Sequence, residues 1–243
     1  MAPLREGAQK CLGWSISTPC AAPSRKKDAM TEPQDLGFPA FYSEAPTIKL
    51  RDPLAQFLGA ARHGVIEYRY TDVVRLSGHS CPTVAGAYLM ALHGLRALYG
   101  TEMPVRGDVE VFMRDAPGSG VTGVISSVVQ LVTGAAGETG FPGAGQLALF
   151  ARKNLLVFGA DVDGVLGMRR RDTGKAVTVH FDNAVVPWPG EMRPLMTKAF
   201  ADQANSAELE RFAQLWQERV RSMLVEYADN PALVWVSDWQ PAP

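Results

Sequence analysis

The chain has 243 residues, of which 47% are hydrophobic and 20% are charged, and its formal net charge is −1. This length fits one large domain or one domain with a short appendage, and the composition is ordinary for a globular protein. No apolar run approaches the roughly 18 residues that a membrane-spanning helix needs, and the basic residues form no continuous stripe. We therefore expect neither a membrane nor a nucleic acid as a partner.

Residues 1–45 show no hydrophobic periodicity, and they hold five prolines, a basic patch and two of the three cysteines, Cys11 and Cys20. This composition predicts a disordered leader. It does not predict a signal peptide, because the longest apolar stretch is short and is interrupted by Ser and Thr. Alternatively, translation starts at Met30. In either case no disulfide framework is indicated, so we expect a cytoplasmic location and one domain over residues 46–243.

From Asp52 onward the pattern is regular. It predicts a short helix over residues 54–61 and a strand over 65–70. The strongest predicted helix covers residues 82–99, because proline suits the first turn of a helix and Gly100 can cap its end. A strand over 108–113 and a second helix over 118–132, capped by Gly134, are expected next.

A glycine-rich loop over 137–145 precedes strand-like runs at residues 146–152, 155–158, 165–170 and 176–181. Residues 172–175, with the sequence Asp-Thr-Gly-Lys, predict a hairpin turn. The chain becomes helical again after 187–190, Asn205 and Glu208 form a capping box for a helix through Tyr227, and 232–236 predicts a last strand. We expect an α+β fold, with a mixed or antiparallel sheet and helices on one face.

The segment Gly78-His79-Ser80-Cys81-Pro82-Thr83 places an imidazole and a thiol two positions apart, where the strongest helix is expected to begin. A helix N-terminus stabilises negative charge such as that of a thiolate. The pair predicts either metal ligands or a catalytic Cys81 nucleophile, with His79 or His180 as its base. A structural cap with a buried thiol is the third interpretation.

Four stretches resemble the family of the formylmethanofuran dehydrogenase E-subunit. Residues 78–82 with Gly86 resemble its G-H-x-C-P-x-x-x-G signature, and residues 130–134, 137–145 and 171–176 resemble its Q-x-x-T-G, glycine-rich and R-x-D-T-G-K-A segments. The resemblance spans about residues 52–228. It implies an α+β domain similar to the catalytic domain of glyceraldehyde-3-phosphate dehydrogenase, often with zinc, in proteins encoded near molybdenum or tungsten enzymes.

The sequence departs from this family where ligands are expected. Relatives often carry cysteine at the positions of Ala135 and, approximately, Val124, and aspartate at the position of Ser127. The zinc ribbon with paired C-x-x-C motifs that many relatives append has no counterpart in this sequence. These differences predict a site with fewer protein ligands than is usual in the family.

We expect His79 and Cys81 to bind zinc, with His180 as third ligand and Asp182 as a ligand or its partner. A water or substrate group would occupy the open position, and heme or another metallocofactor is an alternative guest. His93 is excluded, because twelve residues along a helix place it roughly 18 Å from Cys81. His63 reads as a helix-end histidine.

Three further features carry weaker predictions. Trp188, between two prolines, is either a packing residue or an aromatic wall for a flat ligand, and Glu138 with its neighbouring glycines is a second candidate ligand contact. The basic run of residues 169–171 is either a solvated turn or an anion site. Phe212 and Trp216 face the core or a homodimer contact.

These observations predict a metal- or metallocofactor-binding protein with an open site on His79 and Cys81, accessory to a molybdenum or tungsten oxidoreductase. A thiol enzyme that uses Cys81 as nucleophile is the alternative prediction.

Overall fold

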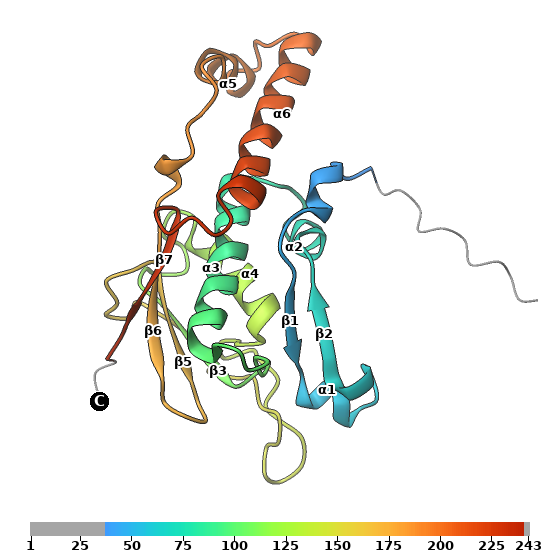
Figure 1. The fold of residues 1–243 in the computed structure, drawn as a ribbon, viewed down its shortest axis with the longest axis vertical. Helices are drawn as coiled ribbons and strands as arrows, with labels where there is room; N and C mark the ends of the chain where they lie inside the picture. The colour runs from blue at the N-terminus through green and yellow to red at the C-terminus, as the bar shows by residue number, and fades with distance from the viewer. Residues whose placement is uncertain (1–36, 241–243) are drawn as a thin grey trace, which may run out of the picture. The chain divides into compact units, whose positions relative to one another are not determined.

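In the computed structural model, which describes residues 37–240, five strands form a mixed sheet in the order β4-β3-β5-β6-β7 (Figure 1). The β3–β4 pair is parallel and the other pairs are antiparallel. The β5–β6 pair is the hairpin predicted from residues 172–175. The strands are β3 Val109–Met113, β4 Leu156–Phe158, β5 Leu166–Arg170, β6 Ala176–Phe181 and β7 Val234–Asp238.

Helix α3, Pro82–Tyr99, lies across one face of this sheet, and α4, Thr122–Thr133, packs beside it (Figure 1). Two glycines of α3 permit the close approach. A Cβ at Gly86 would lie 2.3 Å from the Phe181 ring of β6, and one at Gly94 would lie 2.2 Å from the sulfur of Met168 in β5. The sequence predicted α3 with these bounds, and Gly100 and Gly134 end α3 and α4 as expected.

A β-hairpin packs on the other side of the helices. Its strands, β1 Ile48–Arg51 and β2 Val65–Tyr68, are antiparallel. The buried Tyr88 hydroxyl of α3 lies 2.7 Å from the Pro46 carbonyl oxygen and 3.0 Å from that of Tyr68, and so joins the layers. Short elements flank the hairpin: α1 Pro53–Phe57, a 3₁₀ turn at Arg62–Gly64, and α2 Tyr70–Ser77.

The C-terminal part forms a helical hairpin of α5, Met192–Phe200, and α6, Ser206–Arg221, which continues as a π-helix over Ser222–Glu226. The predicted capping box is confirmed, since Asn205 Oδ1 and the Glu208 carboxylate each accept the other residue's N–H at 3.0 Å. Buried side chains occur only in the second half of α6 within the described residues, so its first half contacts mainly α5 (Figure 1).

Some expectations need correction. The strand predicted over 146–152 is a looped segment, in which Ala144 and Leu149 form an isolated bridge. The folded region begins before the expected boundary at residue 46, because the 3₁₀ turn Ala40–Ser43 buries Phe41 and Tyr42 in the core. The expectations for residues 1–36 lie outside the described residues. No helix in the described part of the chain is long and apolar enough to cross a membrane.

Candidate functional site

The G-H-S-C-P segment joins α2 to α3. Gly78 ends α2 with a left-handed backbone (φ 71°), and Cys81 is the N-terminal cap of α3. The Cys81 Sγ accepts the Val84 N–H at 3.5 Å, and Pro82 occupies the first helical position. The predicted placement of Cys81 at a helix N-terminus is therefore confirmed, in an environment that favours negative charge on sulfur.

Ser80, between the two candidate ligands, is anchored on both sides. Its buried hydroxyl lies 2.8 Å from the Tyr70 hydroxyl. Its carbonyl oxygen accepts hydrogen bonds from Trp216 Nε1 at 3.0 Å and Gln217 Nε2 at 3.3 Å. Burial raises the pKa of Tyr70, which keeps this phenol neutral. The centre of the turn is thus fixed by neutral groups, with His79 and Cys81 flanking it.

His79 is exposed, and its Nδ1 lies 2.9 Å from the Ser77 carbonyl oxygen. A carbonyl partner requires a proton on Nδ1, which leaves Nε2 as the nitrogen with a lone pair. The ring lines a pocket of about 250 Å³ together with Gly123, Val124 and Ser127 of α4. Val124 and Ser127 match the positions at which relatives often carry cysteine and aspartate. The α4 wall of this pocket therefore offers no thiol or carboxylate at those positions.

Asp182 lines a different pocket, of about 360 Å³, with Thr83 of α3 and Thr122 at the start of α4. Its Oδ1 accepts the Ala184 N–H at 2.8 Å and so caps the 3₁₀ turn Asn183–Val185. The structure therefore places His79 and Asp182 near neighbouring helix ends, but in separate pockets.

His180 lies on the opposite face of the sheet from α3. Its neighbour Phe181 packs against Gly86, and successive side chains of a strand alternate between faces. His180 instead stacks on Trp235, with ring centroids 4.8 Å apart, and its Nε2 lies 3.1 Å from Ser237 Oγ. The expected third ligand is thus separated from Cys81 by the sheet, because the sequence could not assign the face of the strand end.

The donor set limits which metals fit. Among residues 37–240, no group of three or more His, Cys, Asp or Glu side chains is arranged to hold an ion. His79 and Cys81 supply at most two donors, whereas catalytic zinc sites use three protein ligands and structural sites use four. A zinc ion held by these side chains alone does not fit, and neither residue has a second axial ligand opposite it for a resident heme within that range.

Trp188 contributes to packing. Its ring lies 3.8 Å from the guanidinium of Arg219 and contacts Trp216. The buried Arg219 donates hydrogen bonds to the carbonyl oxygens of Val186, at 2.9 Å, and Asn183, at 2.6 Å. Burial lowers the pKa of Arg219. Helix α6 thereby holds the loop that carries Asp182, so Trp188 has a structural role whether or not it also contacts a ligand.

The glycine-rich loop is explained largely by its own packing. Gly143 has a left-handed backbone (φ 103°), and a Cβ there would lie 2.3 Å from the Ala148 carbonyl oxygen. A Cβ at Gly140 would lie 2.7 Å from the side chain of Ala136. Glu138 is exposed, and its side chain forms no hydrogen bond or ion pair with the described residues. Its predicted contact with a ligand stays a prediction.

Comparison with known families supports the resemblance seen in the sequence. The family model FmdE, described as "Molybdenum formylmethanofuran dehydrogenase operon", matches residues 76–230, well over half of the chain. The chain belongs to the FmdE family. The match includes the Cys81 turn, both helices α3 and α4, the main sheet and α6. No curated protein matches the chain.

Among solved structures, the FmdE chain is similar to a tungsten formylmethanofuran dehydrogenase FmdE-like protein from Syntrophus aciditrophicus. The two share 14% sequence identity, over 72% of this chain and 74% of the other, with a TM-score of 0.37. The expected similarity to the catalytic domain of glyceraldehyde-3-phosphate dehydrogenase stays a prediction.

Sequence reasoning missed a buried ion network far from the FmdE signature. The Asp52 carboxylate accepts hydrogen bonds from Arg106 Nη1 at 3.0 Å and from Arg152 Nη2 at 2.8 Å. It also caps α1 by accepting the N–H groups of Leu54 and Ala55. Since these residues are far apart along the chain, no local motif could have indicated the network.

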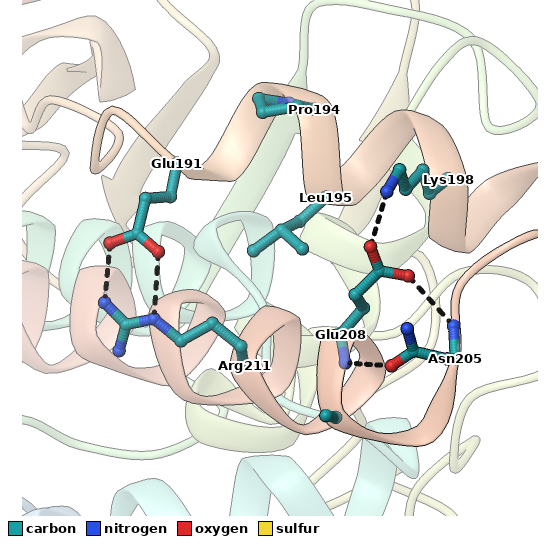
Figure 2. Close-up of a pocket in the computed structure, with 8 residues that line it drawn as sticks. Glu191, Pro194, Leu195, Lys198, Asn205, Glu208 and Arg211 are labelled. Carbon is teal, nitrogen blue, oxygen red and sulfur yellow. Dashed lines mark hydrogen bonds and ion pairs between the residues drawn. The ribbon is translucent and has the colours of Figure 1, made fainter.

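The largest pocket lies between α5 and α6, and it has a volume of about 440 Å³ (Figure 2). Leu195 and Pro194 contribute apolar surface. Figure 2 shows that its charged side chains pair with one another: Glu191 with Arg211 at 2.9 Å, and Lys198 with Glu208. Because both pairs are satisfied across the groove, this FmdE-family pocket offers a ligand little unpaired charge.

Proposed function

We propose that the His79–Cys81 turn captures a metal ion or metal complex as cargo, and that the chain serves as an accessory protein to a molybdenum or tungsten formylmethanofuran dehydrogenase. The family membership supports the choice of partner. The observation that carries the cargo role is the donor set: one oriented imidazole nitrogen and one thiol at a helix N-terminus, with no third donor of the described chain beside them.

The chemistry of the pair suits such a guest. A thiolate and an imidazole together prefer soft or borderline metals, and the Ser77 carbonyl fixes the His79 ring with Nε2 available. Two protein ligands leave the remaining coordination positions to the guest's own ligands. A partly coordinated metal complex therefore fits better than a bare ion held by protein alone, and it can be released again with little rearrangement of the turn.

Titration of the purified full chain with Co²⁺ tests this proposal, because a cobalt–thiolate bond absorbs strongly in the near ultraviolet. We expect Cys81→Ser to abolish this band and His79→Ala to weaken binding roughly tenfold or more. His63→Asn, at an exposed histidine outside the turn, is the matched control and should bind as the parent does. Unchanged metal binding in both site variants would remove the proposal.

The partner is tested separately. A tagged chain, expressed in its own host, should retain a molybdenum or tungsten enzyme when it is recovered from lysate. We expect the Cys81→Ser variant to retain the same enzyme, since protein–protein contact does not need the thiol. Recovery of the chain without any such enzyme would argue against the accessory role, while the metal titration would still stand.

A thiol enzyme is the second candidate, because Cys81 Sγ accepts an N–H at the start of an 18-residue helix. Of the two bases predicted, only His79 lies on the same side of the sheet. This function predicts that iodoacetamide alkylates Cys81 in metal-free protein much faster than it alkylates free cysteine near neutral pH. Alkylation at the rate of free cysteine would exclude a nucleophilic role and leave the cargo site.

A further inference from the structure

A second polar pocket, of about 340 Å³, lies at the opposite end of α3 from Cys81. It is formed by residues 105–108 before β3, residues 147–152 of the long loop, Pro53 and Arg171. The turn beyond Arg171 reaches the last turn of α3, where Lys175 Nζ lies 2.6 Å from the Ala97 carbonyl oxygen. Since 18 helical residues span roughly 27 Å, this pocket is separate from the His79–Cys81 turn.

The pocket carries a surplus of positive charge. Arg106, Arg152 and Arg171 line it, and the carboxylates beside them are Asp108, in the lining, and Asp52, behind it. Three guanidinium groups against two carboxylates leave one positive charge. Arg171 is exposed, and its side chain forms no hydrogen bond or close ion pair within residues 37–240, so it is available to a ligand.

Arg152 is held in place with one donor unused. Its side chain is 9% exposed, Nη2 binds Asp52, and Nη1 donates to the carbonyl oxygen of Arg106. Its Nε has no hydrogen-bond partner among the described residues, which is uncommon for a buried donor. A Cβ at Gly107 (φ 87°) would lie 0.9 Å from Arg152 Nη1, so only glycine permits this placement.

One wall of the same pocket is apolar and conformationally strained. The side chains of Leu147 and Leu149 are 82% and 48% exposed, and Phe150 contacts Phe57 with ring centroids 5.3 Å apart. Ala148 (φ 48°) and Phe150 (φ 63°) adopt the left-handed conformation, which non-glycine residues rarely take. Strain of this kind concentrates at binding and catalytic sites.

We propose that this pocket binds the carboxylate of a small organic acid whose apolar body lies against Leu147, Leu149 and Phe150. The planar guanidinium of Arg171 matches a carboxylate in two parallel hydrogen bonds. The single surplus charge selects a monoanion over a phosphate dianion, and the exposed leucines select an acid with a hydrocarbon part. This site does not depend on the cargo role of the Cys81 turn.

An NMR titration of the ¹⁵N-labelled full chain with hexanoate tests the site. We expect saturable shifts at the amides of Gly107 and Arg171, and little response to hexanol, which lacks the charge, or to inorganic phosphate, which lacks the apolar body. Arg171→Gln should weaken hexanoate binding roughly tenfold, as loss of one charge-assisted pair does. Arg193→Gln, at an exposed arginine of α5, should bind hexanoate like the parent chain.

The proposal is overturned if hexanoate gives no saturable shifts, if hexanol gives the same shifts, or if Arg171→Gln binds hexanoate unchanged. Tighter binding of phosphate than of hexanoate would also contradict it, because the charge argument would then be wrong. Leu149→Ser provides a second test at an exposed position that should not affect folding. It should weaken hexanoate while leaving acetate binding, which needs no apolar wall, unchanged.

Discussion

At the N-terminal end of α3, the Cys81 turn is held by neutral hydrogen bonds from Tyr70, Trp216 and Gln217 to Ser80. Near its other end, the Arg106–Arg152 pocket is held by charges buried around Asp52. A neutral hydrogen bond contributes about 1 kcal/mol, and a buried charge left without its partner costs several times more. The turn can therefore adjust to a guest, while the pocket keeps its shape.

Asp52→Asn should have the largest effect on this contrast. The variant keeps the side-chain shape but leaves Arg106 and Arg152 without their carboxylate, so the free energy of unfolding should fall by about 3–5 kcal/mol. Urea unfolding measures this loss. Asp115→Asn, which breaks only the exposed pair with Arg114, should cost at most about 1 kcal/mol. Equal losses in the two variants would show that burial of the network does not matter.

Acidification probes the same carboxylate. Burial opposes its ionisation, but the hydrogen bond from the Ala55 N–H and the charges of Arg106 and Arg152 hold the pKa of Asp52 below its usual value. Its stabilising effect is therefore complete above the unfolded-chain pKa of about 3.9, and is lost as the pH falls through the lower folded pKa. The difference in unfolding free energy between parent and Asp52→Asn should shrink below about pH 4. A constant difference would contradict this linkage.

At the Cys81 end, Gly86→Ala should have an intermediate effect. The added Cβ would lie 2.3 Å from the Phe181 ring, and overpacking of this kind costs about 1–3 kcal/mol. Thermal unfolding measures it. Gly118→Ala is the control, because a Cβ there meets no atom within 4 Å. If both substitutions are neutral, α3 does not pack on β6 as closely as described.

The smallest effect is expected from Tyr70→Phe, which removes one hydrogen bond from Ser80 and should cost about 1 kcal/mol. Two other donors still hold the Ser80 carbonyl, so the turn should persist. The rate of Cys81 alkylation measures its geometry and should change no more than about threefold. A collapse of stability as large as that of Asp52→Asn would end the distinction between the two ends of α3.

Local patterns predicted the elements that local chemistry specifies. Helix α3, strand β6 and the Asn205 capping box follow from proline, glycine, alternation and capping residues close together in the chain. The predicted strand over 146–152 failed for a tertiary reason. Arg152 is fixed by Asp52, and left-handed residues bend the segment away from a sheet, so its alternating apolar residues line a pocket instead.

The candidate site was predicted only in part, for the same reason. Its motif placed Cys81 at the helix cap, but the face of β6 on which His180 lies depends on which neighbour packs under α3, and Phe181 takes that position. The Asp52 network joins three distant segments, so its members look like ordinary surface charges in the sequence. Sequence patterns identified the turn, and only the fold identified the pocket.

The hydrogen bond from Trp216 to Ser80 also has a consequence for the order of assembly. The two residues are 136 positions apart, so a chain emerging from the ribosome presents His79 and Cys81 long before α6 exists. Contacts of such long range form late, since the intervening chain must first be brought together. The turn therefore reaches its final geometry only after synthesis is complete, and capture of a guest is a task for the finished protein.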